Sequence, residues 1–206
     1  SASRGQMIMA CGTGKTYTSL WIKEELEAKT TLVLLPSLSL LSQTLWEWTF
    51  ASSKPFEALC VCSDETVGRN QDEDSIVSTT LDVSFPTTSD PEEIKQFLKR
   101  DVNKVIFSTY HSSPSIALAQ EDSSLPIFDL VVADEAHRCT GITGKAFTVV
   151  LDGSLIKAKK RLFTTATPKT FVTNLKKKAS EMGVDILDMS DENSFGKEFH
   201  NLTFAQ

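Results

Sequence analysis

The chain has 206 residues, of which 40% are hydrophobic, and its formal net charge at pH 7 is −6. A chain of this length can bury the hydrophobic core of a single domain. Its net negative charge argues against indiscriminate nucleic-acid binding by the whole surface, but a local nucleic-acid-binding groove is not excluded. The chain has neither a run of about 18 apolar residues nor an opening signal-peptide pattern, so we expect a soluble, cytoplasmic protein without a membrane partner.

Apolar strand-like segments alternate with helix-like segments along the chain, a pattern typical of a doubly wound parallel sheet. The third helix has the clearest start, because Asp90 can cap it and Pro91 suits its first turn. The expected strands are Gln6–Ala10, Thr31–Leu35, Glu57–Val61, Lys104–Phe107, Leu130–Ala133, Arg161–Thr165 and Asp185–Asp188, and the expected helices are Lys15–Ala28, Leu38–Thr49, Pro91–Lys99, Ser115–Gln120 and Lys169–Ser180.

The sequence ACGTGKT, from Ala10 to Thr16, has the composition of a phosphate-binding loop. Small residues allow backbone N–H groups to turn towards a phosphate, a lysine meets the β- and γ-phosphates, and a hydroxyl ligates Mg²⁺. The loop lies between an apolar strand and a helix, whose N-terminus attracts anions. Because Met9 occupies the position of the first glycine in the strict motif, a glycine-containing turn is the alternative. The predicted nucleotide-binding residues are Ala10, Cys11, Gly12, Thr13, Gly14, Lys15 and Thr16.

Several apolar side chains and thiols are expected to be buried. In the helix after the loop, we expect Leu20, Trp21 and Leu26 to face the sheet and the charged side chains to face water. Cys60 and Cys62 form a CxC pair on an expected strand, whose alternate side chains share one face. Since no second close pair completes four ligands, we expect core thiols in a reducing compartment rather than a metal site.

Two segments have a strong charge bias. Residues 63–89 are predicted to form a surface insertion, whose acidic residues either face water or meet a partner. Between Lys145 and Lys178, basic residues greatly outnumber acidic ones. Exposed loop and helix positions would explain them, and so would contact with a phosphate backbone.

The apolar run FDLVVA, at Phe128–Ala133, is typical of a strand that is covered on both faces. It brings Asp134 and Glu135 to the carboxyl end of the strand, where ligands bind in open α/β sheets. One carboxylate can hold the water shell of Mg²⁺, and its neighbour can orient or deprotonate an attacking water. A lone Asp-Glu pair is usually a solvated helix start, but the earlier GKT loop favours an ATP site here.

The motifs resemble, in family order, those of the first RecA-like domain of superfamily 2 helicases and translocases of the DEAH-box type, found in type III restriction subunits and their relatives. In that family an Ala-led loop replaces the leading glycine, as in ACGTGKT, which resembles motif I. The final segment DILDMSDENSFGKEFHNLTFAQ resembles the part that leads out to a second motor domain. The other similar segments are VLLPSLSLLSQ at Val33–Gln43 (motif Ia), STYHS at Ser108–Ser112 (a strand-contacting motif), DEAH at Asp134–His137 (motif II) and TTATP at Thr164–Pro168 (motif III).

This resemblance implies that residues 1–206 form a single α/β domain, a RecA-like P-loop NTPase fold in which helices cover both faces of a mostly parallel sheet. It also implies a motor that uses ATP and Mg²⁺ and couples hydrolysis to movement on nucleic acid, with DNA favoured over RNA. Lys15 would hold the phosphates, Thr16 and Asp134 would hold Mg²⁺, partly through water, and Glu135 would orient or activate water.

The resemblance also places residues at a nucleic-acid surface. Ser37 and Thr109 would grip a strand with hydroxyl or backbone groups, and Pro36 and Tyr110 would lie beside them. A helix cap after the proline is the alternative for Ser37. His111 could also approach nucleic acid, but we favour a capping or surface position for it.

Three further residues would relay the nucleotide state to that surface. The resemblance gives this role to His137, Thr165 and Thr167. The alternatives are strand-end hydrogen bonds for the two threonines and a polar contact after the strand for His137.

The same resemblance bears on partners. A second RecA-like domain would supply arginines to the γ-phosphate, so we expect this chain alone to be nearly inactive, and a nuclease or methyltransferase partner is possible in the longer protein. Two other readings are a different P-loop NTPase, such as a small-molecule kinase, and a non-catalytic nucleic-acid or protein interaction module. The kinase reading leaves the ordered downstream motifs unexplained, and the intact site residues argue against the module.

Overall fold

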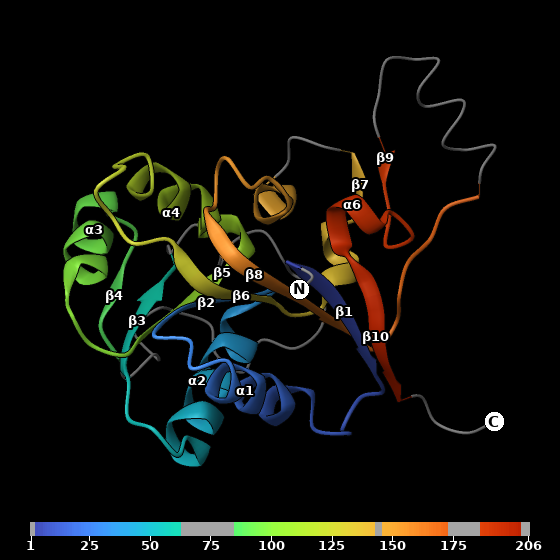
Figure 1. The fold of residues 1–206 in the computed structure, drawn as a ribbon, viewed down its shortest axis with the longest axis horizontal. Helices are drawn as coiled ribbons and strands as arrows, with labels where there is room; N and C mark the ends of the chain where they lie inside the picture. Colours follow the sequence, from blue (N-terminus) through green and yellow to red (C-terminus); the bar gives the residue numbers. More distant parts are fainter. Residues whose placement is uncertain (1–2, 63–84, 143–145, 173–185, 203–206) are drawn as a thin grey trace.

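A computed structural model describes residues 3–62, 85–142, 146–172 and 186–202 (Figure 1). Most of the expected insertion, Lys145 and the basic Lys176–Lys178 therefore lie outside the described residues. The expected helix Lys169–Ser180 is wrong for residues 169–172, and its remainder lies outside these ranges. Residues 169–172 are not helical; Phe171 N donates to Asp188 Oδ2 at 2.6 Å, and Lys169 O accepts from Met189 N at 3.0 Å.

The main sheet has eight strands in the order β10-β1-β8-β6-β2-β5-β3-β4, and each pairing is parallel. Since parallel neighbours need crossover connections, helices alternate with strands along the chain. The strands are β1 (Arg4–Met9), β2 (Thr30–Leu35), β3 (Glu57–Val61), β4 (Thr87–Thr88), β5 (Lys104–Thr109), β6 (Phe128–Ala133), β8 (Ala158–Thr165) and β10 (Lys197–Leu202).

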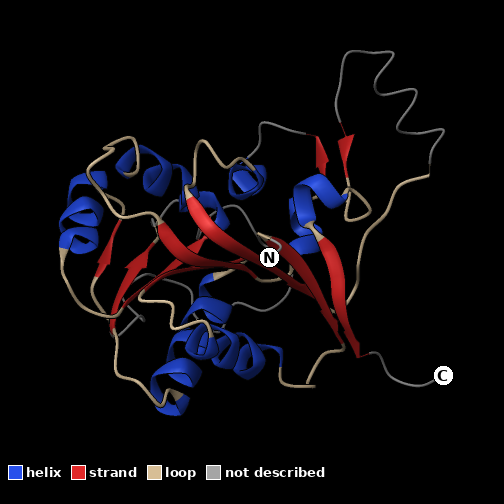
Figure 2. Cartoon of the chain, viewed as in Figure 1, coloured by secondary structure: helices blue, strands red, loops and turns tan. Residues whose placement is uncertain are grey.

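Helices cover both faces of this sheet, as Figure 2 shows. In β2, Leu32 and Leu34 join one core cluster while Val33 and Leu35 join the other, because successive strand side chains point to opposite faces. The first cluster includes residues of α3, α4 and α6, and the second includes residues of α1 and α2. The helices are α1 (Lys15–Glu25), α2 (Leu38–Ala51), α3 (Pro91–Lys99), α4 (Ser113–Ala119), α6 (Glu192–Phe195) and the 3₁₀ turns η3 (Tyr110–Ser112), η4 (Ala136–Cys139) and η5 (Ala146–Leu151).

The doubly wound α/β architecture is therefore confirmed, and most elements begin or end within a few residues of the expected bounds. Helix α3 has the expected bounds, with Asp90 accepting a hydrogen bond from Glu92 N at 2.9 Å. Cys60 and Cys62 are buried in the same core cluster, as expected of alternate residues in a strand. In the described ranges, no helix combines the length and apolarity needed to cross a lipid bilayer.

The expected burial of helix α1 is wrong for two of three residues. Leu20 is fully buried, but Trp21 and Leu26 are 59% and 42% exposed. Neighbouring helical residues point about 100° apart, so Leu20 and Trp21 cannot share one narrow face. The buried face instead takes Ser19 and Lys23, and the Lys23 Nζ lies 5.7 Å from the centroid of the Phe56 ring. A lysine stem can cover apolar surface while its ammonium meets an aromatic ring.

The end of the chain contains two strands, one of which differs from its expected form and one of which the sequence did not predict. The expected strand Asp185–Asp188 is reduced to β9 (Ile186–Leu187), which pairs antiparallel with β7 (Gly141–Ile142) outside the main sheet. Strand β10 instead pairs parallel with β1, and Ala10 N donates to Leu202 O at 2.8 Å. All its residues are exposed, so the sequence has no apolar pattern that predicts this edge strand. The edge strand β4 was likewise missed, because its two residues lie within the expected insertion 63–89.

Gly196 provides a test of the contact between this end and β1. Its φ is 77° and its ψ is 179°, and an added Cβ would lie 2.3 Å from the carbonyl carbon and oxygen of Arg4. This backbone region is essentially restricted to glycine. We therefore expect Gly196→Ala to lower the free energy of unfolding by about 2 kcal/mol or more, measured by urea denaturation.

Gly153→Ala is the matched control, because its added Cβ would approach only the ends of two arginine side chains, at 3.8 Å. We expect this control to leave stability almost unchanged. Equal stability of the two variants would contradict the assigned packing of Gly196 on β1.

Candidate functional site

The carboxyl ends of five adjacent strands carry the sequence motifs. In the order β1-β8-β6-β2-β5, each strand is followed by a polar segment, and parallel pairing brings these segments to one edge of the sheet. Ligands bind at this edge in open α/β folds. The structure thus gathers five segments that are far apart in the sequence.

The loop between β1 and α1 has the backbone form of a phosphate cradle. Gly12 and Gly14 have φ values of 75° and 91°, in the left-handed region that favours glycine. Thr13 closes the turn, since its N and its Oγ1 both donate to Ala10 O, at 3.3 and 2.7 Å. Nothing lies within 4 Å of an added Cβ at either glycine, so the loop leaves open space at the N-terminus of α1. This terminus attracts anions.

Behind the loop, α2 supports the start of α1. The indole Nε1 of the buried Trp48 donates to Thr16 O at 3.0 Å. The hydrogen bond from α2 therefore stabilises the first turn of α1, which contains the expected Mg²⁺ ligand Thr16. Sequence reasoning missed Trp48, and the signal available was its spacing of three and seven residues from Leu45 and Leu41, on the apolar face of α2.

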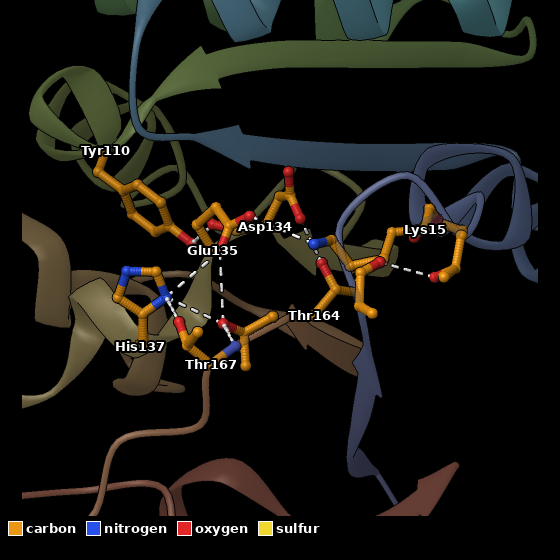
Figure 3. Close-up of polar contacts among 11 residues, drawn as sticks. Lys15, Tyr110, Asp134, Glu135, His137, Thr164 and Thr167 are labelled. Atoms are coloured by element: carbon orange, nitrogen blue, oxygen red, sulfur yellow. Dashed lines mark hydrogen bonds and ion pairs between the residues drawn. The ribbon is translucent and has the colours of Figure 1, made fainter. Parts of the chain in front are cut away.

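The two acidic residues after β6 meet the lysine of the loop. The Lys15 Nζ lies 3.3 Å from Glu135 Oε1 (Figure 3), and both side chains are partly buried. Thr164 Oγ1, from β8, donates to Asp134 Oδ1 at 2.6 Å. Three strands thus bring a cation, two carboxylates and a hydroxyl together.

The two carboxyl groups have opposite pKa shifts. Burial, with help from the Glu135 charge, raises the pKa of Asp134, although the Thr164 hydrogen bond and Lys15 oppose this rise. The hydrogen bond with His137 lowers the pKa of Glu135, burial opposes that effect, and the Lys15 charge lowers the pKa further. Glu135 is thus a stabilised carboxylate, whereas ionised Asp134 lacks sufficient compensation. A bound cation would supply it, so the oxygen donors of Asp134 fit a hard divalent ion such as Mg²⁺.

The backbone turns sharply at Glu135. This residue has φ 49° and ψ 48°, in the left-handed region that non-glycine residues rarely adopt. It lies between Asp134, whose N donates to Leu34 O at 2.9 Å, and Arg138, whose N donates to Glu135 O at 3.0 Å. Such strained residues persist only where the surroundings hold them, and they cluster at functional sites.

The three expected coupling residues are brought together. His137 Nδ1 lies 2.9 Å from Thr165 Oγ1 and 3.4 Å from Thr167 Oγ1. Thr165 Oγ1 also donates to Glu135 Oε2 at 3.4 Å and accepts from Thr167 N at 3.1 Å. His137 Nδ1 is 3.3 Å from the same Glu135 oxygen. A continuous polar network therefore joins the segments after β6 and β8.

The four residues expected at a nucleic-acid surface have different environments. Ser37 caps α2 by accepting from Leu40 N at 3.3 Å, as its alternative predicted, and Pro36 is buried. Thr109 and Tyr110 are also buried, with hydrogen bonds from Thr109 Oγ1 to Ser112 Oγ and from Tyr110 Oη to Asp134 O. The polar atoms of both side chains thus have internal partners, and a nucleic-acid contact at either residue stays a prediction.

The basic segment does not form one exposed stripe. Arg161 is buried, with its Nε donating to Val150 O at 3.0 Å. Lys159 pairs with Asp129 at 2.7 Å near the amino end of β8, away from the motif edge. The described part of this segment therefore offers no continuous phosphate-binding surface.

Sequence reasoning also missed Thr164 as a site residue. The available signal was a hydroxyl at the end of an otherwise apolar buried strand, where a polar side chain needs a partner. Only the pairing of β6 with β8 identifies that partner as Asp134.

The chain is similar to known proteins over most of its length. Residues 1–170 match the family model described as the type III restriction enzyme, res subunit. The chain is 32% identical over 170 residues to the "Probable helicase A859L" of African swine fever virus (isolate Tick/Malawi/Lil 20-1/1983), an alignment that covers 82% of this chain and 17% of the viral protein. The chain thus spans less than a fifth of the length of this relative.

Solved structures show the same relationship. The Type ISP restriction-modification enzyme LlaGI has a TM-score of 0.72 and 33% identity, covering 98% of this chain and 18% of that chain. The Type ISP enzyme LlaBIII has a TM-score of 0.73 and 33% identity, covering 97% of this chain and 14% of that chain. The Hef helicase domain of Pyrococcus furiosus has a TM-score of 0.53 and 18% identity, covering 88% of this chain and 34% of that chain. At this low identity the similarity supports only the fold. The chain therefore belongs to the family of the type III restriction enzyme res subunit and forms a RecA-like helicase motor domain.

Proposed function

We propose that this chain binds Mg²⁺-ATP and, as part of a longer protein, couples ATP hydrolysis to movement along DNA. The observation that carries this proposal is the contact of Lys15 with Glu135 at 3.3 Å, which joins the phosphate loop to the acidic pair across 120 sequence positions. The open glycine loop at the start of α1 supports a phosphate ligand at the same place.

Each side chain has a distinct proposed task. Lys15 turns its ammonium from Glu135 to the phosphates, which frees that carboxylate to orient a water and accept its proton. Thr16 and Asp134 hold Mg²⁺, partly through water, and Thr164 fixes one Asp134 oxygen. When bound, the ion supplies positive charge to the phosphate oxygens.

We assign the nucleic-acid partner as DNA. Two restriction enzymes that are 33% identical to this chain are described as bound to DNA or to a DNA substrate mimic. Contacts would come from the backbone near Pro36, from the Ser37 hydroxyl and from the backbone of Thr109 and Tyr110, since the last two side chains are buried. The proposal also places the protein in the cytoplasm, in keeping with four free cysteines.

The polar network of His137, Thr165 and Thr167 would relay the nucleotide state to this surface. A second RecA-like domain would complete the site with arginines, and a nuclease or methyltransferase would act with the motor. Without the second domain, we expect turnover to fall by about 10³ to 10⁵. Vigorous Glu135-dependent turnover by this chain alone would contradict that expectation.

The experiment that tests the nucleotide site is calorimetric titration of the chain with ATP and with ADP in the presence of Mg²⁺. We expect Lys15→Ala to weaken binding at least about tenfold, because it removes the ammonium that meets the phosphates. The matched control is Lys29→Ala, an exposed lysine before the amino end of β2. Equal affinity of wild type and Lys15→Ala would refute the assigned site.

Cys11 offers a second test, because it is the exposed thiol of the phosphate loop while Cys60, Cys62 and Cys139 are buried. We expect saturating Mg²⁺-ATP to slow alkylation of Cys11 several-fold, since the nucleotide covers the loop. Mass spectrometry after a timed pulse of iodoacetamide would measure the rate. The Lys15→Ala variant should lose the protection, and undiminished labelling of the wild type would count against the placement.

The raised pKa of Asp134 indicates that its charge lowers the stability of the fold, although the proposed function needs that charge. The pKa of Asp134 is higher in the folded protein than in the unfolded chain, so the folded state holds this proton more tightly. The contribution of Asp134 to stability therefore falls as the pH rises from its unfolded pKa through its folded pKa. At pH 7 we expect Asp134→Asn to raise the free energy of unfolding by about 1 kcal/mol while it weakens Mg²⁺-dependent nucleotide binding. The gain should shrink when urea denaturation is repeated below about pH 4, where the unfolded Asp is also protonated.

Asp122→Asn is the control, because hydrogen bonds with Ser124 lower the pKa of Asp122. This variant should show no stability gain at pH 7. A pH-independent gain for Asp134→Asn would contradict the electrostatic explanation.

A further inference from the structure

Tyr110 joins two segments of the site through a single hydroxyl. It is the first residue of η3, directly after β5, and its side chain is fully buried. Its Oη donates to the backbone carbonyl oxygen of Asp134 at 2.7 Å, and Figure 3 shows the ring pointing from its own segment towards the acidic pair. The proposed mechanism gives this contact no role.

The hydroxyl meets both ends of the turn that contains Glu135. Besides the Asp134 carbonyl, it interacts with the thiol of Cys139, the last residue of η4. Burial raises the pKa of Tyr110 well above its usual value and that of Cys139 to about 12. Both groups therefore keep their protons, and the phenol donates its hydrogen bond to the Asp134 carbonyl oxygen.

The ring that carries this hydroxyl is held in place. Tyr110 stacks on Phe147 of η5 with centroids 5.1 Å apart and an interplanar angle of 24°. Phe147 also meets the ring of His111 edge-on at 4.9 Å. In addition, Ser113 Oγ donates to Tyr110 O at 2.8 Å. The hydroxyl is thus a fixed point relative to β5 and η5.

A fixed Asp134 carbonyl constrains the next residue. The C=O of Asp134 and the N–H of Glu135 belong to one planar peptide group, so holding the oxygen also orients the bond about which the Glu135 φ is defined. Glu135 has the unfavourable φ of 49°. Without an external contact, relaxation towards a common backbone region would rotate this peptide and move the carboxylate away from Lys15.

We propose that Tyr110 is a positioning residue, whose hydroxyl holds the Asp134–Glu135 peptide so that the Glu135 carboxylate keeps its place beside Lys15 and the bound phosphates. This proposal rests on the proposed function, because it assigns Glu135 to the water-activating step. The Tyr110 hydroxyl acts on the backbone carbonyl of Asp134. Its effect passes through the backbone of Glu135.

The first test is Tyr110→Phe in the longer protein that carries this chain and the proposed second motor domain. The change keeps the ring on Phe147 and removes only the oxygen. We expect kcat for ATP to fall about tenfold, while the Kd for Mg²⁺-ATP stays within about twofold, because the phosphate loop is untouched. Tyr17→Phe is the matched control, since Tyr17 is 38% exposed and packs on Trp21.

A double-mutant cycle separates positioning from general structural damage. If Tyr110 acts through Glu135, then Tyr110→Phe should cause no further loss in single-turnover rate when Glu135→Gln is already present. A tenfold loss in both backgrounds would overturn the proposal, because a merely structural role would affect both. An unchanged kcat for Tyr110→Phe alone would also overturn it.

A second measurement uses this chain alone and needs no turnover. Hydrogen–deuterium exchange should become faster in residues 134–140 of Tyr110→Phe, which include the hydrogen-bonded amides of Asp134 and Arg138. Exchange in α3 should stay unchanged, as should both segments in Tyr17→Phe. Unaltered exchange of residues 134–140 would overturn the proposal. If the wild-type protein shows no turnover, the proposed function fails, and the exchange result still decides whether Tyr110 holds this peptide.

Discussion

The parallel pairing of the central strands is the constraint on which the site depends. Since β1, β8, β6, β2 and β5 are paired side by side in one direction, the residues that follow them lie along the same edge. The contact of Lys15 with Glu135 and that of Asp134 with Thr164 both bridge neighbouring or nearly neighbouring strands. An antiparallel strand in this group would send its following residues to the opposite edge. The parallel strand order therefore decides which side chains meet at the site.

The acidic pair shows how this arrangement divides the work between two adjacent residues. Glu135 is turned towards a lysine and a histidine, which favour its charged form, whereas Asp134 is partly buried, with a threonine hydroxyl as its hydrogen-bond partner. The left-handed backbone of Glu135 makes this divergence possible, because it redirects the chain immediately after β6. The site thus combines a strained backbone, a carboxylate with a raised pKa and an open glycine loop, which is typical of a site where stability is reduced in favour of binding.

The final segment of the chain supports the site from the side. Gln6 Nε2 donates to Met189 O at 2.9 Å and to Gly196 O at 2.7 Å, while Arg4 donates to Ser194 O and Leu151 O. These contacts tie residues 189–196 to β1, directly before the phosphate loop. Because Ala10 N donates to Leu202 O, the loop begins where β10 ends. Movement of β10 would therefore displace Ala10, at the start of the phosphate loop.

The sequence by itself determined the α/β class, the phosphate loop and the acidic pair, because these depend on local patterns: apolar runs, glycines at fixed spacing and the residues that follow a buried strand. It did not determine the exposure of Trp21, the burial of Tyr110 or the strand β10, since a polar edge strand has no apolar period and a tyrosine in a polar motif can face either way. Only the tertiary structure decided which hydroxyl meets which carboxylate and which carbonyl meets Tyr110. Those contacts join residues 24 or more positions apart, and strand order and side-chain packing, rather than local pattern, bring such residues together.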